Sequence, residues 1–517
     1  MATGAGTAGI VASGHADTSA AACEVLAAGG NAFDAALAAL AASTVCEPML
    51  TSLGGGGYLM ARPAGQAPVL FDFFVQTPAQ KQAMDRLDFY PILADFGTAK
   101  QEFHVGLGAM AVPGMVAGLF AVHERLGSLP MAEILAPAIS LARRGVIMTP
   151  YQANLNHVLQ SIIEISPAAT ALVAPQGAPE RPARTGERVC NMDLAETLEL
   201  LVREGAGGFY QGEPGQQLVA DCAARGGLLT QHDLDAYQVV CRRPLTVQQA
   251  GATLYLNPPP SPGGTLIALT LGLLAPLLSQ FDDETLACRA LAGAMAQTNA
   301  LRDERELADL EAALDAPQLA ALRALARPAD LFSRGTTHLS VADAAGNLVS
   351  LTTSNGEGTG YVIPHTGVMM NNMLGEQDLN PQGFHRWQPN SRLASMMCPT
   401  VVRFADGSEL ALGSGGSNRI RSAIAQVLLH RLRGQASLRQ AVAAPRLHLE
   451  GQQLSFEAGF SAPAVAALKA DWPRFEAWPS HCHFFGGVHA VERGPDGALA
   501  GAGDPRRDGR VGRQSVV

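Results

Sequence analysis

The chain has 517 residues, of which 47% are hydrophobic and 16% are charged, and its formal net charge is −10 at pH 7. Nucleic-acid binding needs a concentrated basic face, so this acidic balance argues against a nucleic-acid partner. The chain is longer than one hydrophobic core usually organises, and its apolar content is enough to bury an extensive interior. We therefore expect a large α/β protein of two or more packed layers.

The N-terminal part indicates how the chain begins to fold. Residues 10–60 have the pattern of a strand, a helix and a glycine-rich turn. Within them, the alanine-rich run 35–44 is too short and too interrupted to span a membrane, so it predicts a buried helix and no membrane partner. No basic region followed by an apolar stretch precedes it, which favours a cytoplasmic location unless an export signal has been lost.

Later segments alternate between helical and extended patterns. Met131–Arg144 predicts an amphipathic helix packed under a sheet, and residues 265–330, rich in alanine and leucine, predict a helical arm. Extended patterns return after residue 336, in Leu339–Ala342, Leu348–Thr353, Gly367–Met370 and Thr400–Phe404.

The cysteines predict neither a zinc ribbon nor a disulfide scaffold. The eight cysteines show no close pairs of the metal-binding kind, so we expect reduced and mostly buried thiols. His481, Cys482 and His483 form the one cluster that suggests a metal, but alternate strand residues point to opposite faces, so only two could reach one ion. We predict no metal and no organic cofactor.

Arginines cluster near the C-terminus. The segment 506–513 contains four of them, interleaved with aspartate and glycine. This composition predicts a solvated tail or a structural ion-pair cluster rather than a basic binding face.

The segment 335–343, Gly-Thr-Thr-His-Leu-Ser-Val-Ala-Asp, is a candidate for self-cleavage. A threonine hydroxyl is a weak nucleophile, and an N-terminal threonine can use its own α-amine as the base. With an amine pKa near 8, a useful fraction of that amine is neutral at about pH 7. An internal threonine gains such an amine only when the preceding bond is cut, and glycine tolerates the strained backbone that cleavage demands. Gly335-Thr336 is therefore the candidate scissile bond.

The same segment also predicts an ordinary β-hairpin. Its β-branched and apolar residues, and those of 348–351, flank a turn that carries Gly346 and Asn347. The two interpretations are compatible, because a nucleophile at the first residue of a core strand is held rigidly by the sheet.

Other motifs accompany this segment in a fixed order along nearly the whole chain. They are 9–13, 24–26, 29–36, 53–58, 112–118, 209–212, 226–230 and 257–264 before it, and 371–373, 389–392, 413–416, 444–446 and 503–506 after it. In order and spacing they resemble the gamma-glutamyltransferase family (gamma-glutamyl transpeptidases) of N-terminal nucleophile hydrolases.

The resemblance implies a fold, a processing event and a reaction. The fold would be α/β (α+β), a four-layer αββα sandwich. Cleavage would give a large subunit, 1–335, and a small subunit, 336–517, which remain one intertwined heterodimer. Thr336 would attack the amide of a small molecule or peptide, and the acyl-enzyme would pass its acyl group to water or to an amine.

The resemblance also assigns site residues. Gly415 and Gly416 match the glycine pair whose amides stabilise the oxyanion, although a tight strand-to-helix turn explains them equally. A hydroxyl about eighteen positions after the nucleophile orients it, which falls on Ser354 or, with a one-residue slip, on Thr353. Asn355 matches an asparagine that contacts substrate.

At the substrate-binding positions, this chain has only some of the residue types that the resemblance implies. Ser395 matches one of two paired serines, while the second is a methionine here, and Glu376 stands where an aspartate holds the α-ammonium group, with Asp378 as a substitute. Phe74 stands where the family has the arginine that binds the α-carboxylate, so Arg392 is a candidate replacement.

Three functions follow in order of preference. The first is a gamma-glutamyltransferase or glutathione hydrolase. The second is an amidase of the cephalosporin- or glutaryl-acylase type acting on a less charged acyl group, because Phe74 replaces a cation. The third is an uncleaved, inactive homologue with a binding role.

Overall fold

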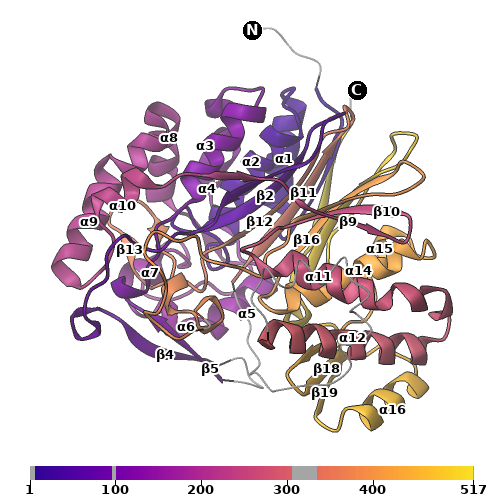
Figure 1. Cartoon of the computed structure of the whole chain (residues 1–517). Helices are drawn as coiled ribbons and strands as arrows, with labels where there is room; N and C mark the ends of the chain where they lie inside the picture. The colour runs from indigo at the N-terminus through magenta and orange to yellow at the C-terminus, as the bar shows by residue number, and fades with distance from the viewer. Residues whose placement is uncertain (1–5, 96–99, 305–334, 381, 516–517) are drawn as a thin grey trace.

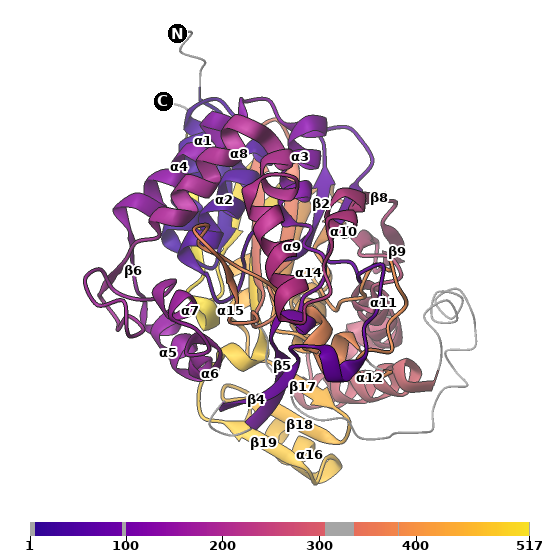
Figure 2. The same cartoon turned by 90° about the vertical axis from the view of Figure 1, so that its left-hand side faces the viewer.

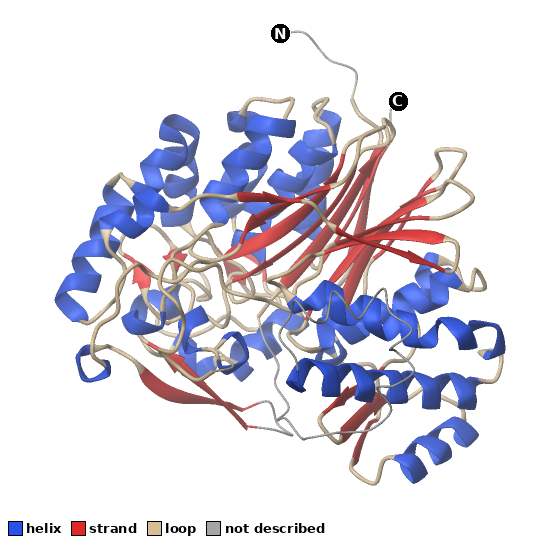
Figure 3. Cartoon of the chain, in the orientation of Figure 1, coloured by secondary structure: helices blue, strands red, loops and turns tan. Residues whose placement is uncertain are grey.

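The computed structural model describes residues 6–95, 100–304, 335–380 and 382–515. Two large antiparallel sheets face each other at the centre, and helices cover the outer face of each, which gives four layers (Figure 1 and Figure 3). The predicted αββα sandwich is confirmed.

The first sheet has seven strands and contains the candidate cleavage segment. In pairing order its strands are β22 (Arg510–Gln514), β1 (Gly9–Ser13), β11 (Thr337–Asp343), β12 (Leu348–Ser354), β2 (Gly56–Arg62), β3 (Val69–Phe73) and β8 (Val240–Arg242). The strand that begins beside the candidate nucleophile therefore lies inside the sheet, between β1 and β12.

The second sheet has six strands. In pairing order they are β21 (Leu499–Ala502), β20 (Gly487–Arg493), β16 (Glu409–Gly415), β15 (Thr400–Arg403), β10 (Ala252–Leu256) and β9 (Leu245–Gln249). Segments from both sides of the Gly335-Thr336 bond contribute strands to each sheet, so the two parts of the chain share one body.

Helices form the two outer layers. Over the seven-stranded sheet lie α1 (Ala16–Ala27), α2 (Ala32–Cys46) and α3 (Met115–Leu126), with α4 (Met131–Arg144) and α8 (Met192–Tyr210) packed against them. Over the six-stranded sheet lie α11 (Pro262–Leu274), α14 (Arg419–Leu432) and α15 (Leu438–Ala443), with α12 (Glu284–Glu304) beyond α11.

Smaller elements lie around the sandwich (Figure 2). Two hairpins are β4 (Tyr90–Asp95) with β5 (Lys100–Val105) and β13 (Val362–Ile363) with β14 (Val368–Met369). Two further small sheets are the pair β6 (Val146–Ile147) with β7 (Arg188–Val189) and the three strands β17 (Leu447–Glu450), β18 (Gln453–Glu457) and β19 (Phe475–Trp478). The helices are α5 (Pro150–Val158), α6 (Gln160–Ile163), α7 (Pro167–Ala171), α9 (Glu213–Arg225), α10 (Gln231–Ala236) and α16 (Ala462–Asp471).

Two cores follow from the alternation of side chains along the strands. On β1, Val11 packs in the core under the helices, whereas Ile10 and Ala12 pack in the core between the sheets. The same alternation on β11 places Leu339 and Val341 under α2. Successive residues of a strand therefore place their side chains in different cores, one under the helices and the next between the sheets.

Helix α2 runs antiparallel to β11 and spans it almost from end to end. At its start, Asn31 and Asp34 form a capping box, and the Ala32 amide donates to Asp343 at the far end of β11 over 2.9 Å. Fifteen helical residues rise about 22 Å, and the seven residues of β11 cover about the same length. The C-cap residue, Glu47, therefore reaches the end of β11 that carries the candidate nucleophile.

Most local expectations are confirmed. Helix α4 has the predicted bounds, α2 buries every residue of the alanine-rich run 35–44, and β11 with β12 is the predicted hairpin. The expected extended segments 367–370 and 400–404 contain β14 and β15. The predicted arm 265–330 is helical as far as residue 304, and its remainder, 305–330, lies outside the described residues.

One helical stretch of the described chain, Pro262–Gln280, is long and apolar enough by composition to cross a membrane. In the fold it covers the six-stranded sheet, and 61% of its most apolar window is buried. A buried core helix accounts for this composition.

Candidate active site

The Gly335-Thr336 bond is buried where three segments meet. The Gly335 amide donates to Glu357 Oε1 over 2.8 Å, and its carbonyl oxygen accepts from Ser354 Oγ over 2.5 Å. Thr336 Oγ1 lies 3.5 Å from the same Ser354 oxygen. A Cβ at Gly335 would collide with the carbonyl oxygen of Gly356, so only glycine fits this close backbone approach.

The strand pleat separates the two candidate hydroxyls. Thr353 pairs with Thr337, and its Oγ1 lies 3.0 Å from Thr51 Oγ1, on the face toward α2. Ser354, one residue later, points to the opposite face and reaches both Gly335 and Thr336. Of the two residues proposed from spacing, the structure brings only Ser354 to the candidate nucleophile.

The Gly415-Gly416 turn lies against the carbonyl group of Thr336. Gly415 ends β16, and a Cβ there would collide with Thr336 O and come within 2.8 Å of Arg507 Nη1. Gly416 has φ +123°, a conformation that other residues rarely adopt. Both glycines are therefore needed for this close approach to Thr336.

Two of the predicted substrate contacts adjoin the cleavage segment. Asn355 donates to the carbonyl oxygen of Met369 over 3.3 Å, and its own side-chain oxygen is buried without a hydrogen bond to any described residue. Glu376 is buried, and its Oε1 lies so close to Gly356 that a Cβ there would collide with it. Both residues thus adjoin Gly356, whose carbonyl oxygen lies against Gly335.

Asp378 contacts the residue that follows the Gly415-Gly416 turn. It accepts a hydrogen bond from Ser417 Oγ over 3.2 Å, and Ser417 directly follows the glycine turn with φ +53°. Asp378 therefore holds the turn rather than sharing a position with Glu376.

The remaining predicted substrate residues contribute to the interior. Phe74 is 1% exposed and stacks on Tyr58 with 5.4 Å between ring centroids, in the core between the sheets. Arg392 binds the carbonyl oxygen of Phe74, lies 3.6 Å from Asp72, and stacks over Tyr237 at 4.7 Å. Ser395 accepts from the Met397 amide over 3.1 Å. No described contact links these three predicted residues to Thr336.

Three charged residues at the site were missed in the sequence. Glu357 holds the Gly335 amide; Glu47 accepts from Thr337 Oγ1 over 3.1 and 3.2 Å; and Arg507 Nη1 donates to Thr336 O over 3.1 Å. Burial raises the pKa of Glu47 to about 7, and the hydrogen bond from Thr337 and the charge of Arg507 oppose that rise. The only sequence signal for Arg507 was the C-terminal arginine cluster.

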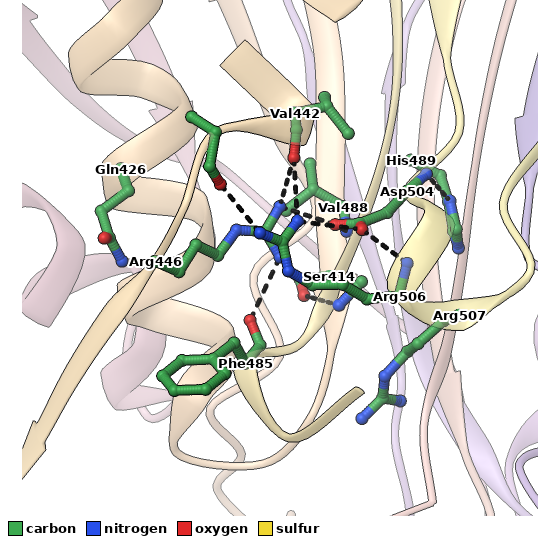
Figure 4. Close-up of polar contacts among 12 residues, drawn as sticks. Ser414, Gln426, Val442, Arg446, Phe485, Val488, His489, Asp504, Arg506 and Arg507 are labelled. Carbon is green, nitrogen blue, oxygen red and sulfur yellow. Dashed lines mark hydrogen bonds and ion pairs between the residues drawn. The ribbon is translucent and has the colours of Figure 1, made fainter. Parts of the chain in front are cut away.

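That arginine cluster is divided between core and surface. Figure 4 shows its buried residue Arg506, which pairs with Asp504 at 3.2 Å. Arg446, from outside the cluster, pairs with the same carboxylate at 2.6 Å. Arg506 also pairs with Glu457 at 2.5 Å. The ion-pair alternative is therefore correct for Arg506, whereas the arginines of β22, at 510 and 513, are exposed.

His338 is a satisfied core histidine two residues after the nucleophile. Its ring nitrogens lie 2.8 Å from Thr352 Oγ1 and 2.9 Å from Ser340 Oγ. Burial, with a smaller contribution from His489, lowers its pKa well below the ordinary value. It is neutral at physiological pH and contributes to packing between the sheets.

Among the described residues, one group of His, Cys and Asp side chains has ligand atoms within 4.8 Å of one another, namely His15, Asp17 and Cys46. His15 Nδ1 already accepts from the Asp17 amide over 3.1 Å as the N-cap of α1. All eight cysteines are free, and Cys241 is the exposed one. The cap explains this group, so we assign no metal to it.

Comparisons with known proteins identify a family and two similar proteins. The profile of the family described as Gamma-glutamyltranspeptidase matches residues 18–513. The chain is 34% identical to an acylase ACY 1 proenzyme of Pseudomonas sp. (strain V22), over 98% of this chain and 93% of that protein. It is 30% identical to the glutathione hydrolase proenzyme of Escherichia coli (strain K12), over 96% and 90% respectively.

A solved structure matches the fold over the same length. The crystal structure of cephalosporin acylase from Bacillus halodurans superposes with a TM-score of 0.82, at 24% identity, and covers 98% of this chain and 96% of that chain. Matched nearly end to end, with a threonine at the start of an inner strand and a glycine turn against it, the chain belongs to the gamma-glutamyltranspeptidase family of N-terminal nucleophile hydrolases.

Proposed function

We propose that this chain is a proenzyme that cuts its own Gly335-Thr336 bond and then uses Thr336 to hydrolyse or transfer the acyl group of an amide. The observation that carries the proposal is the position of Ser354 Oγ, 2.5 Å from the Gly335 carbonyl oxygen and 3.5 Å from Thr336 Oγ1. A donor on the scissile carbonyl and a hydroxyl beside it are the two components of an intramolecular attack.

The first stage breaks one peptide bond. Thr336 Oγ1 attacks the Gly335 carbonyl carbon, the C–N bond breaks, and the acyl group moves from nitrogen to oxygen as an ester. Water then hydrolyses the ester, which leaves a carboxylate on Gly335 and a free α-amine on Thr336. This amine is the base that the mature enzyme needs.

The second stage acts on the substrate amide. Thr336 Oγ1 attacks the amide carbonyl while the α-amine takes its proton, the leaving amine receives that proton, and an acyl ester remains on Thr336. Water releases the free acid, or a second amine takes the acyl group. The turn at Gly415 and Gly416 lies against the Thr336 carbonyl group, and we assign to its amides the stabilisation of the oxyanion.

The first candidate substrate class is γ-glutamyl amides, of which glutathione is one. Its α-ammonium group needs a carboxylate, and the Glu376 carboxylate lies against Gly356, whose carbonyl oxygen adjoins Gly335. Both relatives named above are proenzymes, and one of them is a glutathione hydrolase.

One observation favours a second class, acyl amides that lack the α-amino-acid group. The position of the carboxylate-binding arginine holds Phe74, which lies in the core, and Arg392 is committed to Asp72, Tyr237 and the backbone of Phe74. A carboxylate at that place would have no guanidinium partner from these residues. Simple aliphatic acyl amides, which lack that carboxylate, then become the better substrates, and glutaryl amides, which lack only the ammonium, rank between them and the γ-glutamyl amides.

The two substrate classes can be distinguished with three p-nitroanilides whose acyl groups differ stepwise by one charged group. The γ-glutamyl compound has both charged groups, the glutaryl compound lacks the ammonium, and the pentanoyl compound lacks both. A kcat/KM highest for γ-glutamyl, with a KM that rises selectively for it in Glu376→Gln, supports the first class. A preference for glutaryl or pentanoyl that Glu376→Gln leaves unchanged supports the second.

A chain that stays whole and inactive on all three compounds would contradict the proposed function and favour a binding role. Intact-mass spectrometry of the wild type beside Thr336→Ala decides this before any substrate is chosen. Both relatives named above are proenzymes, so we expect two fragments from the wild type alone.

A further inference from the structure

The guanidinium of Arg507 lies against the candidate nucleophile residue without a carboxylate of its own. Arg507 is 4% exposed, and its Nη1 donates to Thr336 O over 3.1 Å while its Nη2 donates to His483 O over 3.3 Å. No carboxylate lies within ion-pair distance of it in the described ranges, in contrast to its neighbour Arg506. The charge is therefore not neutralised by direct contact.

The contact is made to an atom that Thr336 keeps after cleavage. Within one residue the carbonyl oxygen and the backbone nitrogen are close, so the guanidinium lies within about 7 Å of the nitrogen that becomes the α-amine. A buried positive charge at that distance disfavours a second positive charge. An α-ammonium at Thr336 would be such a charge.

We propose that Arg507 is a positioning residue that holds the Thr336 backbone and keeps its α-amine in the neutral, proton-accepting form. This inference rests on the proposed function, because the α-amine exists only after cleavage. It adds a cation from the C-terminal segment to the nucleophile's environment, on the side of the Gly415-Gly416 turn.

Other charged or titratable groups face the same region and must be separated from this effect. They are Glu47 at the end of α2, Glu357 on the Gly335 amide, Tyr151 of α5, Cys482, His483 of the following 3₁₀ turn, His489 of β20 and Asp508. Glu357 and Asp508 oppose Arg507, because a carboxylate stabilises an ammonium.

Glu47 titrates within the assay range. Burial raises its pKa to about 7, whereas burial lowers the pKa of His483 and of His489 to about 4. The two histidines are thus neutral where the amine titrates. A Glu47→Gln variant removes the remaining overlap.

The test is the pH dependence of kcat/KM for mature enzyme, whose acid limb reports the essential base of the free enzyme. Arg507→Gln, Arg507→Lys and the control Arg513→Gln are each made in the wild type and in Glu47→Gln. We expect the acid limb of Arg507→Gln to move up by about one pH unit. The acid limb of Arg507→Lys should lie between those of its parent and Arg507→Gln, and that of Arg513→Gln should match its parent. At a pH below the limb, Arg507→Gln then loses roughly tenfold more activity than above it.

An acid limb that does not move in processed Arg507→Gln would overturn the proposal. Failure of both Arg507→Gln and Arg507→Lys to fold or to be cut would also overturn it, because Arg507 would then be a structural residue. The wild type is tested first for cleavage and turnover. If it fails there, the proposed function fails, independently of Arg507.

Discussion

Ser354 donates its hydroxyl to the carbonyl oxygen of Gly335 over 2.5 Å, across a separation of 19 residues in the chain. The adjacent hydroxyl, Thr353, points to the opposite face of β12 and contacts Thr51. One step along a strand therefore separates a residue that contacts the scissile bond from one that packs under α2.

This relationship predicts different effects for two neighbouring substitutions. Ser354→Ala removes the donor on the scissile carbonyl, so we expect self-cleavage to slow by roughly 10²-fold or more. Thr353→Val keeps the shape of its side chain and loses only the contact with Thr51, so cleavage continues at a rate near that of the wild type. Gel quantification of the two fragments over time measures both rates. Equal rates in the two variants would remove Ser354 from the mechanism.

The role of Thr336 as nucleophile can be tested with alanine and serine at this position, since the two replacements differ only in the hydroxyl group. Thr336→Ala cannot be cut, whereas Thr336→Ser keeps a hydroxyl and an α-amine, so we expect slower but complete processing. Mass spectrometry of the intact protein distinguishes one chain from two. Fragments from Thr336→Ala that divide after Gly335 would point to another nucleophile or to a contaminating protease.

The glycine turn predicts that Gly415→Ala abolishes both cleavage and turnover. A Cβ there would collide with Thr336 O and press on Arg507 Nη1, so the nucleophile and the oxyanion site would separate. Gly272 of α11 is the matched control, because a Cβ there meets nothing within 4 Å. Gly272→Ala should remain active and gain up to about 1 kcal/mol of stability, since alanine favours a helix. Thermal melts and anilide hydrolysis measure the two properties.

The buried carboxyl of Glu47 predicts a pH-dependent stability. Its pKa is raised from 4.5 to about 7 in the fold, so between these values the folded state binds more protons than the unfolded state. Stability from this group is therefore complete below about pH 4.5 and falls as the pH rises to about 7, by up to about 3 kcal/mol.

Glu47→Gln has no carboxyl to titrate and should lack this fall. Urea unfolding of uncut Thr336→Ala protein, with and without Glu47→Gln, measures the difference across that pH range. Parallel curves for the two proteins would mean that the Glu47 carboxyl is solvated in the folded state.

The ion-pair cluster of Figure 4 predicts a strong dependence on Asp504. Asp504→Asn removes the charge that faces both Arg446 and Arg506, and we expect a loss of about 3–5 kcal/mol because two buried cations lose a partner. The exposed pair of Arg289 and Asp471 is the control, and Asp471→Asn should cost less than about 1 kcal/mol. Similar losses in the two variants would show that solvent reaches the cluster.

The local sequence pattern predicted secondary structure correctly where the spacing of neighbouring residues decides it. The amphipathic spacing of 131–144 predicted α4, the alanine run predicted buried α2, and the β-branched segments around Gly346 predicted the hairpin. Spacing alone did not decide whether Ser354 or Thr353 orients the nucleophile, because the face to which each side chain points depends on the register of β12 with β11. It also placed Phe74 and Arg392 at the site, whereas packing puts both in the interior.

The sequence by itself determined the family, the layered fold and the candidate scissile bond, because each rests on residue types at fixed spacings along the chain. Only the tertiary structure decided what surrounds that bond. Glu47 meets Thr337 across 290 residues, and Arg507 meets Thr336 across 171. No local pattern contains such pairs, since they arise when α2 spans β11 and the C-terminal segment folds back against the nucleophile. Burial then raises the pKa of Glu47, which composition cannot predict.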